Sequence, residues 1–421
     1  MERARTLLGA NSRKAFDCCT LISGAEGMAT GPGSDRALAA LLKALGASEK
    51  RLKQPGPAPT VVRADLDPSP RQQRQVKELQ DFTQEIFRQS KRARADSFWN
   101  RIKAASPQDW ESAVIPFRKD FWEEHLGRLP SPVLPANPRT RKLFDRPTWT
   151  GYEAVLDVYP EVFAWGYLLV PKDLKPGERR PVVVCQHGLE GLPASCLNED
   201  PNSEDFKYYK GFAAQLAAEG FVVFAPHAPY RGHDRFRQLQ RKANPLKASL
   251  FSVIVAQHSR LLDWLGELPF VDAKRIGFYG LSYGGAAAMR VPAVLDRYAL
   301  SICSGNFNDW IRKNVSLDSS TTYLIRGEYE MVEFDLGDTF NHAEMAALIA
   351  PRPFMVERGR HDSVGVDEWV AGEYAKVRRF YDQLGIPDRT AIEFFDGGHA
   401  INGVGTFDFL RRHLDWPKPK Q

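Results

Sequence analysis

The segment Arg275–Gly285 combines a serine with glycines at the spacing of a nucleophile elbow. It reads Arg-Ile-Gly-Phe-Tyr-Gly-Leu-Ser-Tyr-Gly-Gly, with Gly280 and Gly284 two residues before and two residues after Ser282. A short apolar run precedes the serine and the small residues Ala286–Met289 follow it, which predicts a strand, a sharp turn and a helix. So tight a turn requires that positions 280 and 284 lack a Cβ. Ser282 is therefore the predicted nucleophile, and a plain glycine-rich turn is the alternative.

A serine nucleophile of this kind needs an acid and a histidine later in the chain, each just after a strand. The apolar stretch 354–357 runs into Arg-Gly-Arg-His-Asp, which places Asp362 on the loop beyond it. A second short strand, 391–395, runs into Asp-Gly-Gly-His, which ends on His399. The two glycines allow a sharp turn that presents the imidazole at the sheet edge. Asp362 and His399 are therefore the predicted acid and base.

Two nearby carboxylates are alternatives for the acid. A lone aspartate in a loop is often a turn residue or a helix cap, so Asp367 or Glu357 could be the acid instead of Asp362. His413 is the other late histidine, but it lies in a helical pattern and is expected at the surface.

Two backbone amides are predicted to form an oxyanion hole. The apolar strand 181–186 is followed by His-Gly-Leu-Glu-Gly. In such sites the loop after this strand supplies one N–H and the residue after the nucleophile supplies the other. Leu189 and Tyr283 are the predicted donors, and Gly188 lets the main chain turn its amide toward the substrate. His187 is expected to brace the turn through a hydrogen bond rather than take part in catalysis.

One basic cluster, Tyr230–Arg237, follows the predicted strand 221–225 and so lies at the catalytic edge of the sheet. Arg231 is the residue of this cluster predicted to contact an anionic group of the substrate. A solvated basic loop is the alternative.

Alternating strands and helices surround these motifs. The alternation predicts an α/β fold, an eight-stranded, mostly parallel sheet with helices on both faces. Near-continuous apolar runs are typical of strands buried on both faces. The predicted helices are 208–219, 249–268 and 370–384, and the predicted strands are 152–158, 163–170, the strand at 181, 221–225, 275–279, 298–303, 354–357 and 391–395.

Residues from about 150 to 416 resemble the α/β-hydrolase fold, and within it the bacterial serine hydrolases of the dienelactone hydrolase and acetyl xylan esterase group. The stretches that carry the resemblance are 181–191, 217–226, 270–285, 349–354 and the Gly-Gly-His at 397–399. The resemblance implies this fold and a Ser-Asp-His triad. The dienelactone hydrolases proper use a cysteine nucleophile, so Ser282 favours ester hydrolysis over opening of a lactone ring.

The chain before this domain is predicted to divide in two. Residues 1–70 are rich in Gly, Ala, Pro and Arg and are expected to be mobile, apart from a short amphipathic helix near 37–45; Met28 is an alternative start. Residues 71–149 are predicted as a helical region that packs on the hydrolase domain, 150–416. The apolar residues at helical spacing are Val76, Leu79, Phe82, Ile86, Phe87, Phe98, Trp99, Ile102, Trp110, Phe117, Phe121 and Trp122.

Composition argues against several classes of protein. A net charge of +5 in 421 residues is typical of a mixed solvated surface, so no nucleic-acid partner is expected. No stretch approaches the roughly 20 apolar residues of a membrane span, and the run at 20–23 is too short for a signal peptide. The five cysteines show no disulfide framework or zinc spacing, which favours a reducing compartment and hence the cytoplasm. The sequence leaves the oligomeric state open.

These residues together predict a serine hydrolase that cleaves a carboxylic ester, carbohydrate-linked or of a small molecule, through an acyl-enzyme. No metal or organic cofactor is expected. A serine peptidase of the prolyl oligopeptidase type resembles the chain at Gly-Leu-Ser-Tyr-Gly-Gly, but such peptidases carry a β-propeller that the helical residues 71–129 cannot supply. A non-catalytic binding protein on the same fold would also fit the sequence, as would an acyltransferase that shares every residue named.

Overall fold

A computed structural model describes residues 31, 33–47, 56–60, 62, 63, 65–132, 134–323 and 333–418. The chain divides into two compact units, Met1–Gln73 and Arg74–Gln421. The first unit contains the helix α3 (Asp35–Ala44), which confirms the short helix predicted near 37–45. Ser34 caps this helix by accepting a hydrogen bond from the amide of Ala37. Met28 and most of the segment predicted to be mobile lie outside the described residues.

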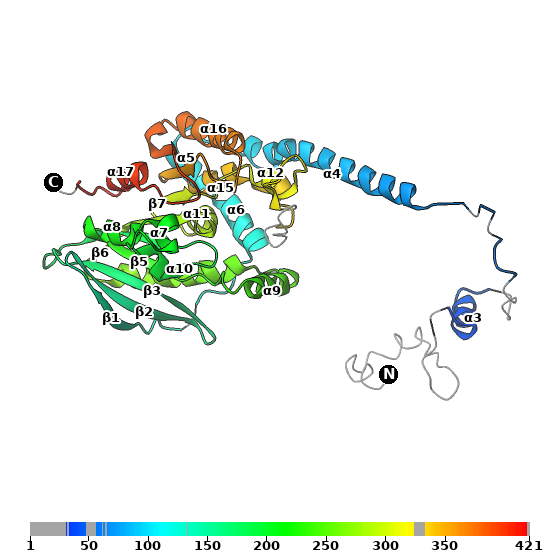
Figure 1. Ribbon diagram of the computed structural model, residues 1–421, viewed down its shortest axis with the longest axis horizontal. Coiled ribbons are helices and arrows are strands. Elements are labelled where there is room, and N and C mark those ends of the chain that lie inside the picture. Colours follow the sequence, from blue (N-terminus) through cyan, green and yellow to red (C-terminus); the bar gives the residue numbers. More distant parts are fainter. Residues whose placement is uncertain are drawn as a thin grey trace. The chain divides into compact units, whose positions relative to one another are not determined.

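The second unit is built on one sheet (Figure 1). Its strands run in the order β1-β2-β3-β5-β4-β6-β7-β8-β9. The pairs β1–β2, β2–β3 and β3–β5 are antiparallel, and all pairs from β5–β4 to β8–β9 are parallel. This confirms the predicted α/β fold with a mostly parallel sheet. The strands are β1 (Arg139–Asp145), β2 (Trp149–Tyr159), β3 (Val162–Pro171), β4 (Arg180–Gln186), β5 (Val222–Pro226), β6 (Val271–Leu281), β7 (Leu300–Ser304), β8 (Phe354–Gly359) and β9 (Thr390–Phe395).

The predicted number of eight strands was wrong, because the described sheet has nine. The additional strand is β1, which lies inside the region 71–149 that was predicted to be helical. Its sequence, Arg-Thr-Arg-Lys-Leu-Phe-Asp, is exposed along nearly its whole length. An edge strand that buries neither face needs no apolar alternation, so its sequence carries no periodic signal.

Helices cover both faces of the sheet. Side chains alternate between the faces, so Val182 and Val184 of β4 join one apolar cluster while Val183 and Cys185 join the other. The first cluster includes residues of α10 (Leu250–Glu267), α11 (Tyr283–Val294), α15 (His342–Ile349) and α16 (Asp367–Gln383). The second includes residues of α8 (Phe212–Ala218) and α17 (Val404–His413). Burial on both faces explains why the central strands are continuously apolar.

The helices before β1 differ along their length in how they pack. They are α4 (Ser69–Ser97), η2 (Trp99–Arg101), α5 (Pro107–Ala113), α6 (Ile115–Asp120) and η3 (Phe121–Leu126). Phe98, Trp110 and Phe121 are buried in the first apolar cluster, and the Trp110 indole donates a hydrogen bond of 2.9 Å to the carbonyl of Ala347 in α15. The first of the apolar residues predicted at helical spacing do not pack in this way. The side chains of Val76, Leu79, Phe82 and Ile86 are exposed.

Two further expectations concern membrane-spanning helices and the pairing of the cysteines. Across the described ranges no helix is both long and apolar enough to cross a bilayer. Cys185 and Cys303 are buried on strands, as predicted, and together with the buried Cys196 they are unbridged. Cys18 and Cys19 lie outside the described residues. The cytoplasmic location stays a prediction.

Candidate active site

Ser282 lies at a sharp turn between β6 and α11. Its backbone has φ 61° and ψ −119°, a conformation that is strained for a residue with a side chain. A Cβ at position 280 would lie 2.2 Å from the carbonyl oxygen of Gly284, and a Cβ at 284 would lie 2.3 Å from the carbonyl oxygen of Gln186. The steric requirement for glycine at both positions is thus confirmed, and the turn projects Ser282 from the carboxyl end of β6.

The structure brings His399 and Asp362 together. The Nδ1 of His399 lies 2.8 Å from Oδ2 of Asp362, and Oδ1 of the same carboxylate accepts a hydrogen bond of 2.8 Å from the amide of Val364. Burial by itself would raise the pKa of the Asp362 carboxyl, but the bonds from His399 and Val364 and the charge of Arg358 outweigh it and hold the pKa below its usual value. An ionised carboxylate on Nδ1 selects the tautomer with a proton there, which leaves Nε2 as the base.

The loops that carry these two residues are joined to one another. The amide of Arg360 donates to the carbonyl of Phe395 at 3.0 Å, and the amide of His361 donates to that of Gly397 at 2.9 Å. A Cβ at Gly359, the last residue of β8, would lie 2.1 Å from the carbonyl oxygen of Gly398. Adjacent parallel strands therefore deliver the acid and the base to a single point at the edge of the sheet.

Gly305 links this pair to the nucleophile. A Cβ at this position would lie 3.0 Å from both Nδ1 and Cε1 of His399. The preceding residue, Ser304, accepts the backbone hydrogen bond of Ser282 through its carbonyl at 2.9 Å. Ser282, Asp362 and His399, which were singled out on separate loops of the sequence, therefore occupy one region of the sheet edge.

The two carboxylates that could have replaced Asp362 have different partners. The carboxylate of Glu357 is fully buried, where Oε2 accepts hydrogen bonds from the hydroxyls of Tyr279 at 2.8 Å and Ser304 at 2.6 Å. Its other oxygen accepts the amides of Asn402 and Gly403, each at 3.1 Å. Asp367 is the first residue of α16 and forms an ion pair with Nε of Arg358 at 3.0 Å. Among these three carboxylates, the hydrogen bond from His399 goes to Asp362.

The loop after β4 lies against the nucleophile. A Cβ on Gly188 would lie 3.0 Å from Cβ of Ser282, so glycine permits this approach. Leu189 occupies the turn that follows, and Tyr283 is the first residue of α11, where the positive end of a helix dipole favours an anion. This placement fits the predicted oxyanion hole. The amides themselves stay a prediction.

His187 and Tyr209 fix the shape of this loop. Nδ1 of His187 donates to the carbonyl of Gly188 at 2.8 Å, and its Nε2 accepts from the amide of Ala228 at 3.1 Å. Burial lowers the pKa of His187 to about 3, so the ring is neutral and braces the turn as expected. The hydroxyl of Tyr209 accepts the Gly188 amide at 2.8 Å, a contact that the sequence offered no pattern to find.

Arg231 lies on an exposed stretch beyond β5. Its side chain is 47% exposed and its Nε lies 4.0 Å from a carboxylate oxygen of Glu190, in the loop after β4. An arginine this accessible can still exchange its protein partner for a substrate anion. Its contact with the substrate stays a prediction.

Sequence reasoning missed Arg358, although its position next to Glu357 at the end of a buried strand was a usable signal. Its side chain is 4% exposed and reaches both Asp362 and Asp367. Two consecutive charged residues at the end of a buried apolar strand, such as Glu357 and Arg358, must find partners inside the protein.

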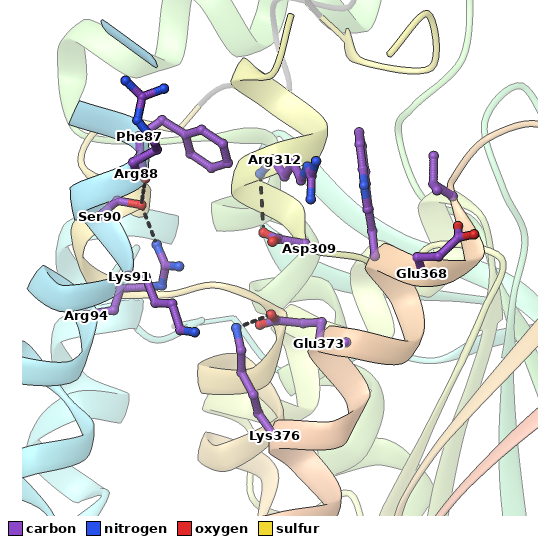
Figure 2. Close-up of a pocket in the computed structure, with 13 residues that line it drawn as sticks. Phe87, Arg88, Ser90, Lys91, Arg94, Asp309, Arg312, Glu368, Glu373 and Lys376 are labelled. Carbon is purple, nitrogen blue, oxygen red and sulfur yellow. Dashed lines mark hydrogen bonds and ion pairs between the residues drawn. The ribbon is translucent and has the colours of Figure 1, made fainter. Parts of the chain in front are cut away.

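A cavity of about 660 Å³ lies apart from the predicted triad. It is bounded by α4, the first turn of α12 (Trp310–Val315) and α16 (Figure 2). Figure 2 shows Ser90 and Arg94 of α4 on one side and Glu373 and Lys376 of α16 on the other. None of the predicted triad residues is among those that line it. Within the described residues, no group of three or more His, Cys, Asp or Glu side chains could hold a metal ion.

The chain is similar in sequence to one protein family and to one curated protein. Residues 166–302 match the dienelactone hydrolase family. The chain is 26% identical over 301 residues to the "Putative hydrolase YtaP" of Bacillus subtilis (strain 168), an alignment that covers 69% of this chain and 96% of that protein. The matched family region includes Ser282 and the loop after β4, whereas Asp362 and His399 lie beyond it.

Solved structures show the same fold at low sequence identity. A glucuronoyl esterase from Solibacter usitatus superimposes with a TM-score of 0.57 and 15% identity, covering 75% of this chain and 95% of its own. A structure named as a "putative acetyl xylan esterase" from Bacteroides fragilis NCTC 9343 gives a TM-score of 0.55 and 18% identity, covering 69% of this chain and 76% of its own. Residues 166–302 thus match the dienelactone hydrolase family, and the chain shares the α/β-hydrolase fold of these solved structures.

Proposed function

We propose that this protein is a serine hydrolase that cleaves a carboxylic ester, with Ser282 as nucleophile, His399 as base and Asp362 as the acid that orients the base. The observation that carries the proposal is the 2.8 Å contact between Nδ1 of His399 and Asp362, at the same sheet edge as a serine in strained nucleophile-elbow geometry.

The proposed reaction proceeds through an acyl-enzyme. His399 takes the proton of the Ser282 hydroxyl at Nε2 as the oxygen attacks the ester carbonyl, and Asp362 stabilises the imidazolium. The amides of Leu189 and Tyr283 hold the oxyanion. The imidazolium then protonates the leaving alcohol, and water attacks the acyl-enzyme by the same route to release the acid.

A small cavity lies beside Tyr283. Its lining combines the apolar side chains of Phe236, Leu250 and Phe251 with the ion pair of Arg290 and Glu333. The alcohol side is proposed to be a carbohydrate or another small molecule, in keeping with the carbohydrate esterases among the structural neighbours.

The peptidase alternative has less support. The described residues between 31 and 132 form helices and contain no strand, so they supply no β-propeller. Acyl transfer to an alcohol other than water would use the same side chains and is distinguished by product analysis alone.

Two measurements test the proposal. Labelling with a fluorophosphonate, followed by peptide mapping, should place the adduct on Ser282; an adduct on another residue overturns the assignment. A substrate panel should contain p-nitrophenyl esters of increasing acyl length, acetylated sugars, uronate methyl esters and aminoacyl naphthylamides. Hydrolysis confined to the naphthylamides would replace the esterase with a peptidase.

A further inference from the structure

Arg358 makes an unusual set of contacts with the loop that carries Asp362. Its Nη1 lies 3.1 Å from Oδ2 of Asp362, and its Nη2 donates to the carbonyls of Asp362 at 2.8 Å and Gly365 at 3.0 Å. Its Nε donates to Asp367 at 3.0 Å. One guanidinium thus binds the side chain, the main chain and the far end of the same loop, from Asp362 to the start of α16.

The strand β8 places this guanidinium on the face of the sheet that α16 covers. Glu357 and Arg358 are consecutive strand residues, so their side chains leave on opposite faces of the sheet. Glu357 holds the loop after β9 through the amides of Asn402 and Gly403, while Arg358 holds the loop after β8. Each loop of the proposed acid–base pair therefore has its own charged brace, and both braces come from one dipeptide.

A single oxygen of Asp362 contacts both Arg358 and His399. Oδ2 lies 2.8 Å from Nδ1 of His399 and 3.1 Å from Nη1 of Arg358. The arginine is always charged, whereas the imidazole becomes charged when it takes the serine proton. Arg358 therefore competes with the imidazolium for the same negative charge.

We propose that Arg358 is a positioning residue for the catalytic pair: it fixes Asp362 toward His399 and limits how strongly the carboxylate can stabilise the imidazolium. The inference rests on the triad given as the proposed function. It assigns to a buried arginine a role that neither the sequence motif nor the fold requires.

The other charged groups around this loop are few. On α16, Asp367 faces the guanidinium, and on α12, the ammonium of Lys313 donates to the carbonyls of Val364 and Thr321. His361 pairs with Asp396 at the exposed surface, 2.7 Å apart. Glu357 lies on the opposite face of the sheet. Of these groups, Arg358 is the permanently charged cation in contact with the Asp362 carboxylate.

The consequence can be measured through the pH dependence of serine reactivity. A neutral residue at 358 removes a positive charge from the carboxylate, which then stabilises the imidazolium more strongly. The imidazole must lose its proton to act as a base, so the rate of serine labelling rises with pH as that proton leaves. The midpoint of this rise is expected to move to higher pH by about one unit. Loss of the forked guanidinium, whose three nitrogens bind the loop, also loosens that loop. The labelling rate on the high-pH plateau is therefore expected to fall roughly 10- to 100-fold.

The experiment compares the full-length protein with Arg358→Gln and Arg358→Lys, using the second-order rate of fluorophosphonate labelling at Ser282 from about pH 5 to pH 9. Arg358→Gln should show both the shifted midpoint and the lower plateau. Arg358→Lys keeps the charge but loses the fork, so its midpoint should stay near that of the wild type while its plateau falls.

A matched control is Arg180→Gln. Arg180 is equally buried, with 4% of its side chain exposed, and pairs with Asp173 and Glu178 at the amino end of β4, away from the catalytic loops. Its loss should lower stability without moving the midpoint.

The outcomes separate the inference from the function on which it rests. An unchanged midpoint in folded Arg358→Gln overturns the role of the charge. If that variant fails to fold, a wild-type plateau in Arg358→Lys overturns the role of the fork, and a lowered plateau with the wild-type midpoint supports the proposal. Absence of labelling at Ser282 in the wild type would instead remove the proposed function itself.

Discussion

The carboxyl edge of the sheet and the helices that precede β1 use their side chains in opposite ways. At the edge, Ser282 has φ 61°, and Asp362 and His399 are held by hydrogen bonds on loops. In the helices, Phe98 and Phe121 are at most 1% exposed and pack among aromatic rings. Strained and polar groups contribute reactivity, and buried apolar groups contribute stability. The proposed active site and the packed helices therefore lie in different parts of the chain, and substitutions in the two regions should have separable effects.

The largest effect is expected for Ser282→Ala. Removing the nucleophile removes the covalent route, so the rate of ester hydrolysis should fall by about 10⁴- to 10⁶-fold. The backbone strain at this position should change little, so the urea midpoint should stay near that of the wild type. Steady-state kinetics and a urea titration on the same preparation check both halves. A variant that keeps its activity would show that chemistry does not reside at this edge.

The second effect is expected for Asp362→Asn, which should lower kcat by about 10²- to 10⁴-fold by favouring the wrong tautomer of His399. Asp367→Asn and Glu357→Gln are the matched variants, because their carboxylates bond to Arg358 and to Tyr279 and Ser304, respectively, rather than to His399. Both should cost much less activity. If either produced the larger loss, the acid role would move to that residue.

The third effect concerns stability and compares two phenylalanines of the helical region. Phe98 is 1% exposed and lies against Trp99 and Phe117, whereas Phe82 is 62% exposed. Phe98→Ala should lower the free energy of unfolding by about 3–5 kcal/mol, because it opens a cavity in the core. Phe82→Ala should change it by less than about 0.5 kcal/mol. Urea unfolding measures both, and equal costs would contradict the packing described for these helices.

The smallest effect concerns pH. His258 in α10 is buried against the hydroxyl of Tyr298, 2.6 Å from Nδ1, and Oε1 of Gln186, 3.2 Å from Nε2. Burial lowers its pKa from 6.5 to about 3. Since the folded pKa is depressed, the unfolded chain takes up this proton first, so stability is present above pH 6.5 and is lost as pH falls toward 3.

His258→Gln should therefore lessen the loss of unfolding free energy between about pH 7.5 and pH 5 by up to about 2 kcal/mol. Urea titrations at the two pH values measure the difference. A wild-type slope in His258→Gln would mean that the histidine is not held neutral in the folded state.

Much of the fold followed from local sequence patterns. Continuous apolar runs marked the strands that are buried on both faces, and the glycines at 280 and 284 marked the turn at Ser282 because a Cβ there would collide with backbone. β1 escaped prediction because an exposed edge strand has no apolar period. Val76, Leu79, Phe82 and Ile86 of α4 are spaced as a packed helix face would be, so periodicity alone could not show that they remain uncovered.

The sequence by itself determined which residue types could form the proposed site, since each follows a strand whose carboxyl end must lie at one edge of the sheet. Only the tertiary structure decided which carboxylate receives His399. Asp362, Asp367 and Glu357 lie within eleven positions of one another, and hydrogen bonding between loops distant in sequence selects the first. The braces Arg358 and Tyr209 were likewise decided by tertiary contacts, because a buried polar group finds its partner in space, without a fixed spacing along the chain.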